Sequence, residues 1–123
     1  MEPQPAIGLV LDCRRPEELA EFWAAALDYV SIGSAGAYVV LLPNGRPGPK
    51  LLLQRVPEAK TVKNRMHLDI DAADIEAEAD RLERLGARRI VVDPLDEHDT
   101  RWILMADPEG NEFCVCDGGA GST

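Results

Sequence analysis

The sequence predicts an α+β protein built from two tandem βαβββ modules. Three observations lead to this fold class: the order strand, helix and three strands occurs twice, each helix has one apolar stripe, and several strands alternate apolar with polar residues. The modules span about residues 5–57 and 65–117 of a single domain, 1–123. Two such modules can place their sheets side by side and roll them into a cup with the helices outside.

The first module begins with a short apolar run, AIGLVLDC, which predicts a strand over residues 6–13. The segment RRPEELAEFWAAALDY follows and predicts a helix. Pro16 suits a first helical turn, and Glu17 and Glu18 favour the positive end of the helix dipole. The helix has one apolar stripe that must lie on a hydrophobic surface, formed by Leu19, Phe22, Trp23, Ala26 and Leu27.

Three strands complete the first module. A weak strand is expected over residues 29–32, and two stronger ones, AYVVLLP and KLLLQRV, flank the turn-forming segment NGRPGP. The run PEAKTVKN then reads as a connector between the modules.

The second module repeats this order. RMHLDID alternates apolar and polar residues and predicts a strand with one wet and one dry face. AADIEAEADRLERLGA predicts a helix with a stripe of Ile75, Ala79, Leu82 and Leu85, and Gly86 suits its left-handed end. RRIVVD, RWILMA and NEFCVC are the three expected strands, and GGAGST is expected to be a frayed tail.

Composition excludes several classes of function. A net charge of −9 argues against nucleic-acid binding, and no apolar run reaches the roughly 18 residues that a membrane helix needs. The start, MEPQPAIG, lacks the pattern of a secretory signal, and three cysteines without a close CxxC pair fit a reducing compartment. We therefore expect a cytoplasmic protein. The basic segment KTVKNR is either a solvated loop or a contact for anions or a second subunit.

Alternation also predicts which side chains line the cup. In the first strand of the second module these are His67, Asp69 and Asp71, opposite an apolar set of Met66, Leu68 and Ile70. In the last strand they are Glu112, Cys114 and Cys116, opposite Phe113 and Val115. The first module contributes Gly8, Val10 and Asp12, and Gln54 as the polar residue among leucines.

The repeated pattern, PEELAEFWAAALDY, the strand with His67 and above all the turn DPEGN before the last strand resemble the vicinal oxygen chelate superfamily. This superfamily includes glyoxalase, bleomycin-resistance proteins, fosfomycin-resistance enzymes and extradiol dioxygenases. The likeness covers nearly the whole chain and is closest to small bacterial glyoxalase-like domain proteins.

The resemblance implies a divalent metal held by a first-strand His or Glu, a His in the second module and a last-strand Glu. These positions fall on Gly8, His67 and Cys114, so two of the three ligands are replaced. Glu112, two residues earlier on the same face, and the neutral Gln54 are possible substitutes. A thiolate at Cys114 with His67 would suit zinc better than magnesium or manganese. We expect no metal or other cofactor, with a divalent ion as the less favoured alternative.

Two interpretations of His67 stay open: a hydrogen-bonded pocket residue, or a general base oriented by Asp69. Cys114 would need a nearby base and a lowered pKa to act as a nucleophile. Trp102 and Tyr38 are strand aromatics that either form the floor of a pocket or pack in the core.

Two functions remain. The first is a glyoxalase-like lyase or isomerase acting on a small oxygenated metabolite, with His67 and Glu112 as catalytic residues and Gln54, Asp69, Trp102 and Cys114 as ligand-binding residues. The alternative is a binding protein of the bleomycin-resistance type that sequesters its ligand without turnover. Small members of the superfamily commonly pair, so we expect a homodimer whose partner is a small molecule, with no nucleic acid and no membrane.

Overall fold

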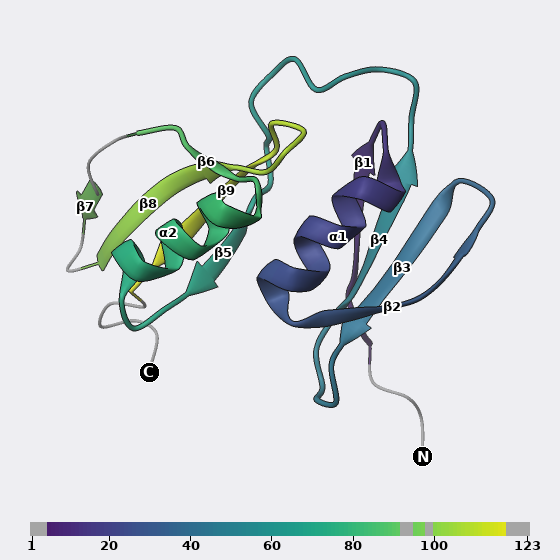
Figure 1. Cartoon of the computed structure of the whole chain (residues 1–123), viewed down its shortest axis with the longest axis horizontal. Helices are drawn as coiled ribbons and strands as arrows, with labels where there is room; N and C mark the ends of the chain where they lie inside the picture. Colours follow the sequence, from purple (N-terminus) through teal and green to yellow (C-terminus); the bar gives the residue numbers. More distant parts are fainter. Residues whose placement is uncertain (1–4, 92–94, 98–99, 118–123) are drawn as a thin grey trace. The chain divides into compact units, whose positions relative to one another are not determined.

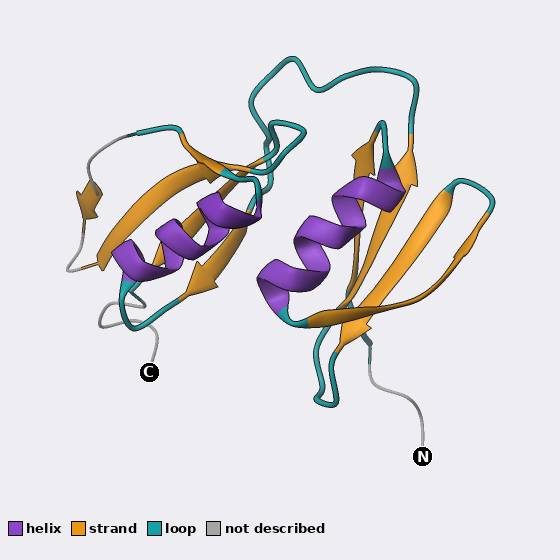
Figure 2. Cartoon of the chain, viewed as in Figure 1, coloured by secondary structure: helices purple, strands orange, loops and turns teal. Residues whose placement is uncertain are grey.

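The computed structural model describes residues 5–91, 95–97 and 100–117. Within them the chain forms two compact units, Met1–Ala59 and Lys60–Thr123, which are called module one and module two below. Each has one helix over a sheet (Figure 1, Figure 2). The fold class is therefore confirmed: an α+β chain of two tandem βαβββ modules. None of the described helices is long and apolar enough to cross a membrane.

Module one contains β1 (Gly8–Cys13), α1 (Pro16–Leu27), β2 (Tyr29–Ala35), β3 (Tyr38–Pro43) and β4 (Lys50–Arg55). Its sheet has the order β1-β4-β3-β2, in which β1 and β4 are parallel and the other pairs antiparallel. The helix α1 lies across one face of this sheet (Figure 1).

The core of module one lies between α1 and the sheet. Trp23 is 1% exposed and meets Phe22 edge to face, with ring centroids 5.0 Å apart. The predicted stripe is confirmed for Leu19, Phe22, Trp23 and Ala26. The strands contribute their alternate residues to this core: Cys13, Val39, Leu41, Leu51 and Leu53. Ile7 lies within the strand predicted over residues 6–13, but it precedes β1 and is 75% exposed.

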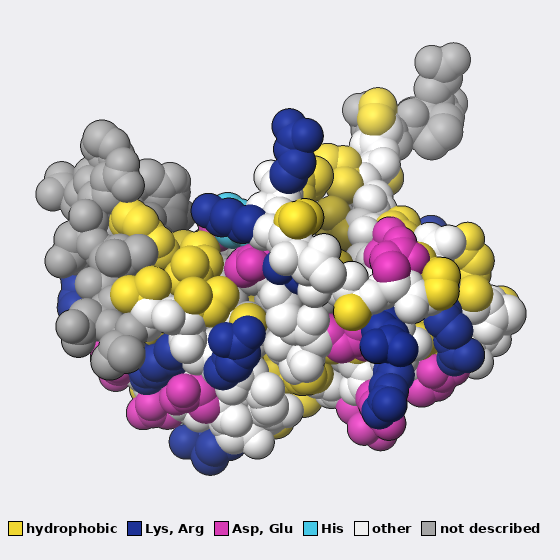
Figure 3. All heavy atoms as spheres, turned by 90° about the horizontal axis from the view of Figure 1, so that it is seen from above, with side chains coloured by type: hydrophobic (Ala, Val, Ile, Leu, Met, Phe, Trp, Pro, Cys, Tyr) yellow, Lys and Arg dark blue, Asp and Glu magenta, His cyan; other side chains and the backbone are white. Residues whose placement is uncertain are grey.

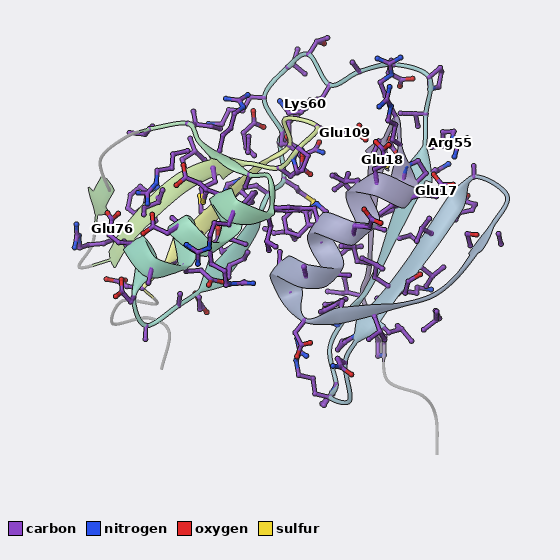
Figure 4. All side chains as sticks on the ribbon, viewed as in Figure 1. Glu17, Glu18, Arg55, Lys60, Glu76 and Glu109 are labelled. Atoms are coloured by element: carbon purple, nitrogen blue, oxygen red, sulfur yellow. The ribbon has the colours of Figure 1, made fainter. Side chains whose placement is uncertain are left out.

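Ion pairs join the ends of elements in module one. Arg55 at the end of β4 donates to both carboxylate oxygens of Glu17 in the first turn of α1, each at 2.9 Å (Figure 4). At the other end of the helix, Arg46 donates to the carbonyls of Leu27 and Asp28 at 2.6 and 2.9 Å. These carbonyls have no partner inside the helix, so the arginine completes its carboxyl end.

Module two contains β5 (Leu68–Asp71), α2 (Ile75–Leu85), β6 (Arg88–Arg89), β7 (Leu95–Glu97), β8 (Thr100–Ala106) and β9 (Glu112–Cys116). Its sheet has the order β5-β9-β8-β6, with β7 paired to β8. This order repeats that of module one, and β5 is parallel to β9 as β1 is to β4. The Asp74 side chain caps α2 by accepting the Ala77 N–H, and Gly86 ends it with φ 121°.

Module two differs from the expectations in four details. The first strand begins at Leu68, so Met66 lies outside it and is 78% exposed. Of the predicted RRIVVD strand, the described residues 88–91 form a strand only at Arg88–Arg89, and residues 92 and 93 lie outside the described part of the chain. Arg89 pairs with Glu76, Asp80 and Glu83 of α2. The short strand β7 was not predicted from the sequence. On the α2 helix, Leu85 belongs to the predicted apolar stripe but is 37% exposed. The GGAGST tail lies outside the described residues.

Candidate functional site

The polar face of module two's sheet is formed by β5, β9 and β8. Register places Asp69 beside Cys114 and Asp71 beside Cys116 in the parallel β5–β9 pair. Across β8, Leu104 lies opposite Cys114 and Trp102 opposite Cys116. The residues between them point to the helix side, where Phe113 and Val115 are buried. The alternation read from NEFCVC thus separates the core face of β9 from its polar face.

Three of the expected site residues converge on this face. One candidate donor atom from each of His67, Asp69 and Cys114 lies within 4.8 Å of the other two, a group found among the residues that the structure describes. The His67 Nε2 and Asp69 Oδ1 atoms are 3.6 Å apart. His67 and Asp69 reach solvent, with side chains 42% and 58% exposed, whereas Cys114 is buried. The site is open on one side.

Burial controls the chemistry of the two thiols on β9. It raises the pKa of Cys114 to about 11, assisted by the negative charge of Asp69 and partly offset by Lys63. It likewise raises the pKa of Cys116 to about 12, with further contributions from the carboxylate of Asp69, from the neighbouring Cys114, and from the carboxylates of Asp71 and Asp117. Both side chains are therefore neutral thiols near pH 7. Cys114 lacks the lowered pKa that a nucleophilic cysteine requires.

Glu112, expected to be catalytic, has partners of its own. Its Oε2 accepts a hydrogen bond from Lys60 Nζ at 2.8 Å, and its Oε1 accepts one from the Asn64 backbone N–H at 2.7 Å. The Glu112 backbone N–H in turn donates to Asn64 Oδ1 at 3.1 Å. Although burial opposes ionisation, these bonds outweigh it and lower the Glu112 pKa. An ionised, paired carboxylate is a poor general acid.

Lys60 and Asn64 were not expected at the site. They lie in the connector, where the sequence shows no periodicity, and Lys60 was grouped with Lys63 and Arg65 as a surface cluster. Its side chain is only 20% exposed and points to β9 instead. The pairing spans 52 positions of the chain, so no local pattern could reveal it.

The remaining expected ligand-binding residues lie on both modules. Trp102 is half-buried on β8 of module two. Gln54 is half-buried on β4 of module one, where register places it between Asp12 of β1 and Tyr38 of β3. These three side chains form a polar row on the face of that sheet opposite α1.

The turn DPEGN is a structural element. Asp107 is 2% exposed, and its Oδ1 accepts the backbone N–H groups of Glu109 and Asn111, each at 2.9 Å. The Asn111 side-chain amide donates to the same carboxylate, and Gly110 takes φ 89°. The turn leads the chain from β8 into β9 and so sets the position of Glu112 and Cys114.

Comparison with known proteins identifies the family. The model of the glyoxalase-like domain matches residues 8–116, which is most of the chain. The chain belongs to this family. No curated protein matches it. The resemblance to the glyoxalase, bleomycin-resistance and dioxygenase group is thereby confirmed.

Solved structures of low sequence identity share the fold of this glyoxalase-like chain. A variant of fosfomycin resistance protein FosX from Listeria monocytogenes, in complex with Mn(II) and a dihydroxypropylphosphonic acid, has a TM-score of 0.75 at 14% identity, covering 99% of this chain and 95% of that one. A glyoxalase/bleomycin resistance protein/dioxygenase from Nocardioides has a TM-score of 0.71 at 19% identity, covering 94% and 85%. A related enzyme from Burkholderia phytofirmans has 0.66 at 17%, covering 88% and 94%.

The residues of this chain do not fit the metal set that the superfamily implies. The first-strand position is Gly8, which offers no donor atom, and the last-strand position is the thiol of Cys114. Glu112 is bound by Lys60 and Asn64 and lies outside the group formed by His67, Asp69 and Cys114. Hard ions such as Mn²⁺ and Mg²⁺ prefer carboxylate and carbonyl oxygens, of which this group supplies one residue.

Module one contains two hollows among its described residues, and neither is lined by the candidate ligands named above. One of about 420 Å³ is lined by Arg14, Ala37 and the end of β4, and one of about 380 Å³ lies between α1 and β2. Neither includes Gln54 in its lining.

Proposed function

We propose that this glyoxalase-like domain binds a small oxygenated metabolite on the polar face of β5, β8 and β9 and acts on it as a lyase or isomerase. The convergence of His67, Asp69 and Cys114 is the observation that supports this most directly. Trp102, opposite Cys116 on the same face, supplies an apolar surface, and Gln54 is included in the same proposal as a ligand-binding residue. The chain acts as a single domain, residues 1–123, in a cytoplasmic homodimer.

His67 is the acid–base residue of this proposal. Its Nε2 lies beside the Asp69 carboxylate at 3.6 Å, which favours the tautomer with a proton on that nitrogen. Nδ1 is then left to accept a proton from a carbon or hydroxyl of the substrate. Glu112 contributes indirectly, because its bonds to Asn64 hold the segment that precedes His67 against β9.

A second function is favoured by a separate observation. Cys114 is a neutral thiol and the Glu112 carboxylate is already paired, which leaves His67 with Asp69 as the acid–base pair. A protein that only sequesters its ligand, as bleomycin-resistance proteins do, needs a binding surface but no further acid–base or nucleophilic groups.

A ligand screen with a turnover readout separates the two functions. Vicinal diols, α-hydroxy acids, α-hydroxy ketones and catechols are added to the protein, binding is followed by thermal shift, and conversion by proton NMR. We expect His67→Ala and Asp69→Asn to lose binding or turnover, while Glu21→Gln on the exposed side of α1 behaves as wild type. Binding without conversion supports sequestration. No shift with any class of compound contradicts both functions.

A further inference from the structure

Three different donor atoms meet at the edge of module two's polar face: an imidazole nitrogen, a carboxylate oxygen and a sulfur. Tetrahedral zinc, with bonds of about 2.0 to 2.3 Å, keeps its donor atoms about 3.3 to 3.8 Å apart. His67 Nε2 and Asp69 Oδ1 already lie 3.6 Å apart, and the whole group lies within 4.8 Å. Small side-chain rotations would bring Cys114 Sγ to the same spacing.

The backbone around these donors is well braced. Asp69 and Cys114 are register partners in the parallel β5–β9 pair. His67 precedes β5 directly, and the segment before it is tied to β9 by the reciprocal hydrogen bonds between Asn64 and Glu112, at 2.7 and 3.1 Å. Lys60 adds a third bond to the same carboxylate. Contacts that hold the backbone of a ligand also hold the ligand's orientation.

The donor types select the ion. A sulfur with an imidazole suits Zn²⁺ and other thiophilic cations, whereas Mn²⁺ and Mg²⁺ require mainly oxygen. Once its proton leaves to solvent, the Cys114 thiolate together with the Asp69 carboxylate carries two negative charges, which a divalent cation neutralises. The cation would also offset the repulsion between these two groups.

We propose that module two by itself binds one thiophilic divalent cation, Zn²⁺ in the cell, through His67, Asp69 and Cys114. The site differs from the superfamily's ligand set in two ways: it takes no ligand from module one, and its carboxylate is Asp69 of β5. Its fourth coordination position is open to solvent, where an oxygen of a small molecule can replace water. The proposal shares its location with the proposed function and changes the role of His67 there: once Nε2 binds the cation, the neutral ring carries its proton on Nδ1, so the acid–base role of His67 belongs to the cation-free protein. The cation site is tested without any substrate.

Cobalt is the probe for this site. Reduced, chelator-treated protein is titrated with Co²⁺ under nitrogen, and the thiolate-to-cobalt charge-transfer and tetrahedral d–d absorption are recorded. We expect both bands to saturate at one ion per chain and to disappear when Zn²⁺ displaces the cobalt. Mn²⁺, followed by its EPR signal, should bind at least 10-fold more weakly than Zn²⁺.

Variants assign the ligands. Cys114→Ser should abolish the charge-transfer band, and Asp69→Asn and His67→Ala should each weaken cobalt binding by about 10- to 100-fold. Cys116→Ser is the matched control, because Cys116 follows on the same strand and face but lies outside the group. Asp69 and His67 are exposed, so their variants should fold, and circular dichroism checks this.

Several outcomes would overturn the proposal. These are the absence of a charge-transfer band, a band that persists in Cys114→Ser, or equal loss in Cys116→Ser. If zinc binds while the ligand screen fails, only the proposed function is lost. If a metabolite binds but cobalt does not, only the cation site is lost.

Discussion

Trp23 shows how much one side chain contributes to module one. Its ring is almost fully buried between α1 and the sheet and packs edge to face on Phe22. We expect Trp23→Ala to lower the free energy of unfolding by about 3–5 kcal/mol, since the surrounding residues cannot fill the cavity. Urea denaturation followed by circular dichroism measures it. Glu21→Ala on the exposed side of the same helix should change the free energy by less than about 0.5 kcal/mol.

Single residues also show how far the sequence predicts the site. Alternation was enough to separate Phe113 and Val115 from Cys114, because the side-chain period of a strand is a local property. It did not show that Asp69 and Cys114 are neighbours, which depends on the register between β5 and β9. Because the family's last-strand ligand position falls on Cys114, Glu112 became the candidate substitute. The sequence could not show that this carboxylate is paired with Lys60, which lies 52 positions away in the chain.

At the scale of elements, both helices were predicted well and the short strands poorly. The stripe and the cap of α2 are encoded within a few residues, with Asp74 at its start and Gly86 at its end. By contrast, β6 and β7 have only two and three residues, too few for a periodic pattern to appear. They form because β8 offers them a partner, which is a tertiary property.

The α2 helix should respond to pH through the Glu78–Arg81 pair. Arg81 donates to both oxygens of Glu78 at 2.8 Å, and this hydrogen bonding lowers the Glu78 pKa, although burial opposes it. A lowered folded-state pKa stabilises the protein above the unfolded value near 4.3, and the stabilisation is lost as pH falls through the folded value.

We therefore expect Glu78→Gln to lower the free energy of unfolding at pH 7 by about 0.3–1 kcal/mol, a range typical of partly exposed pairs. The difference from wild type should shrink toward zero as pH falls through the lowered folded-state pKa of Glu78, because the carboxyl then becomes protonated in both folded and unfolded chains. Urea titrations across this pH range measure it. A difference that is constant with pH would mean that the pair does not contribute through its charge.

At the scale of the whole molecule, acidic and basic side chains are interspersed over the visible surface (Figure 3). Of the basic connector residues, Lys60 is held by Glu112 within its own chain, while Lys63 and Arg65 are exposed. If this segment contacts an acidic surface of a second copy, those two residues are the ones that can do so.

We expect a homodimer that weakens with salt, because exposed charges are screened within about 8 Å at physiological ionic strength. Light scattering at low and high salt should show dissociation, and the double variant Lys63→Glu, Arg65→Glu should dissociate at lower protein concentration than wild type. Glu21→Gln serves as a charge-changing control on α1. A monomer at micromolar concentration in every condition contradicts the dimer, and a dimer indifferent to both changes rests on apolar contacts.

The parallel pairing of first and last strands has a consequence for synthesis. Leu9 pairs with Leu51 in module one, and Leu68 pairs with Phe113 in module two, so each sheet joins the two ends of its own segment. A nascent chain leaving the ribosome cannot complete a module until that module's last strand has emerged. Until β4 appears, β1 has no partner in the sheet and the apolar stripe of α1 lacks the surface that Leu51 and Leu53 provide. Once it appears, module one can fold while module two is still being translated.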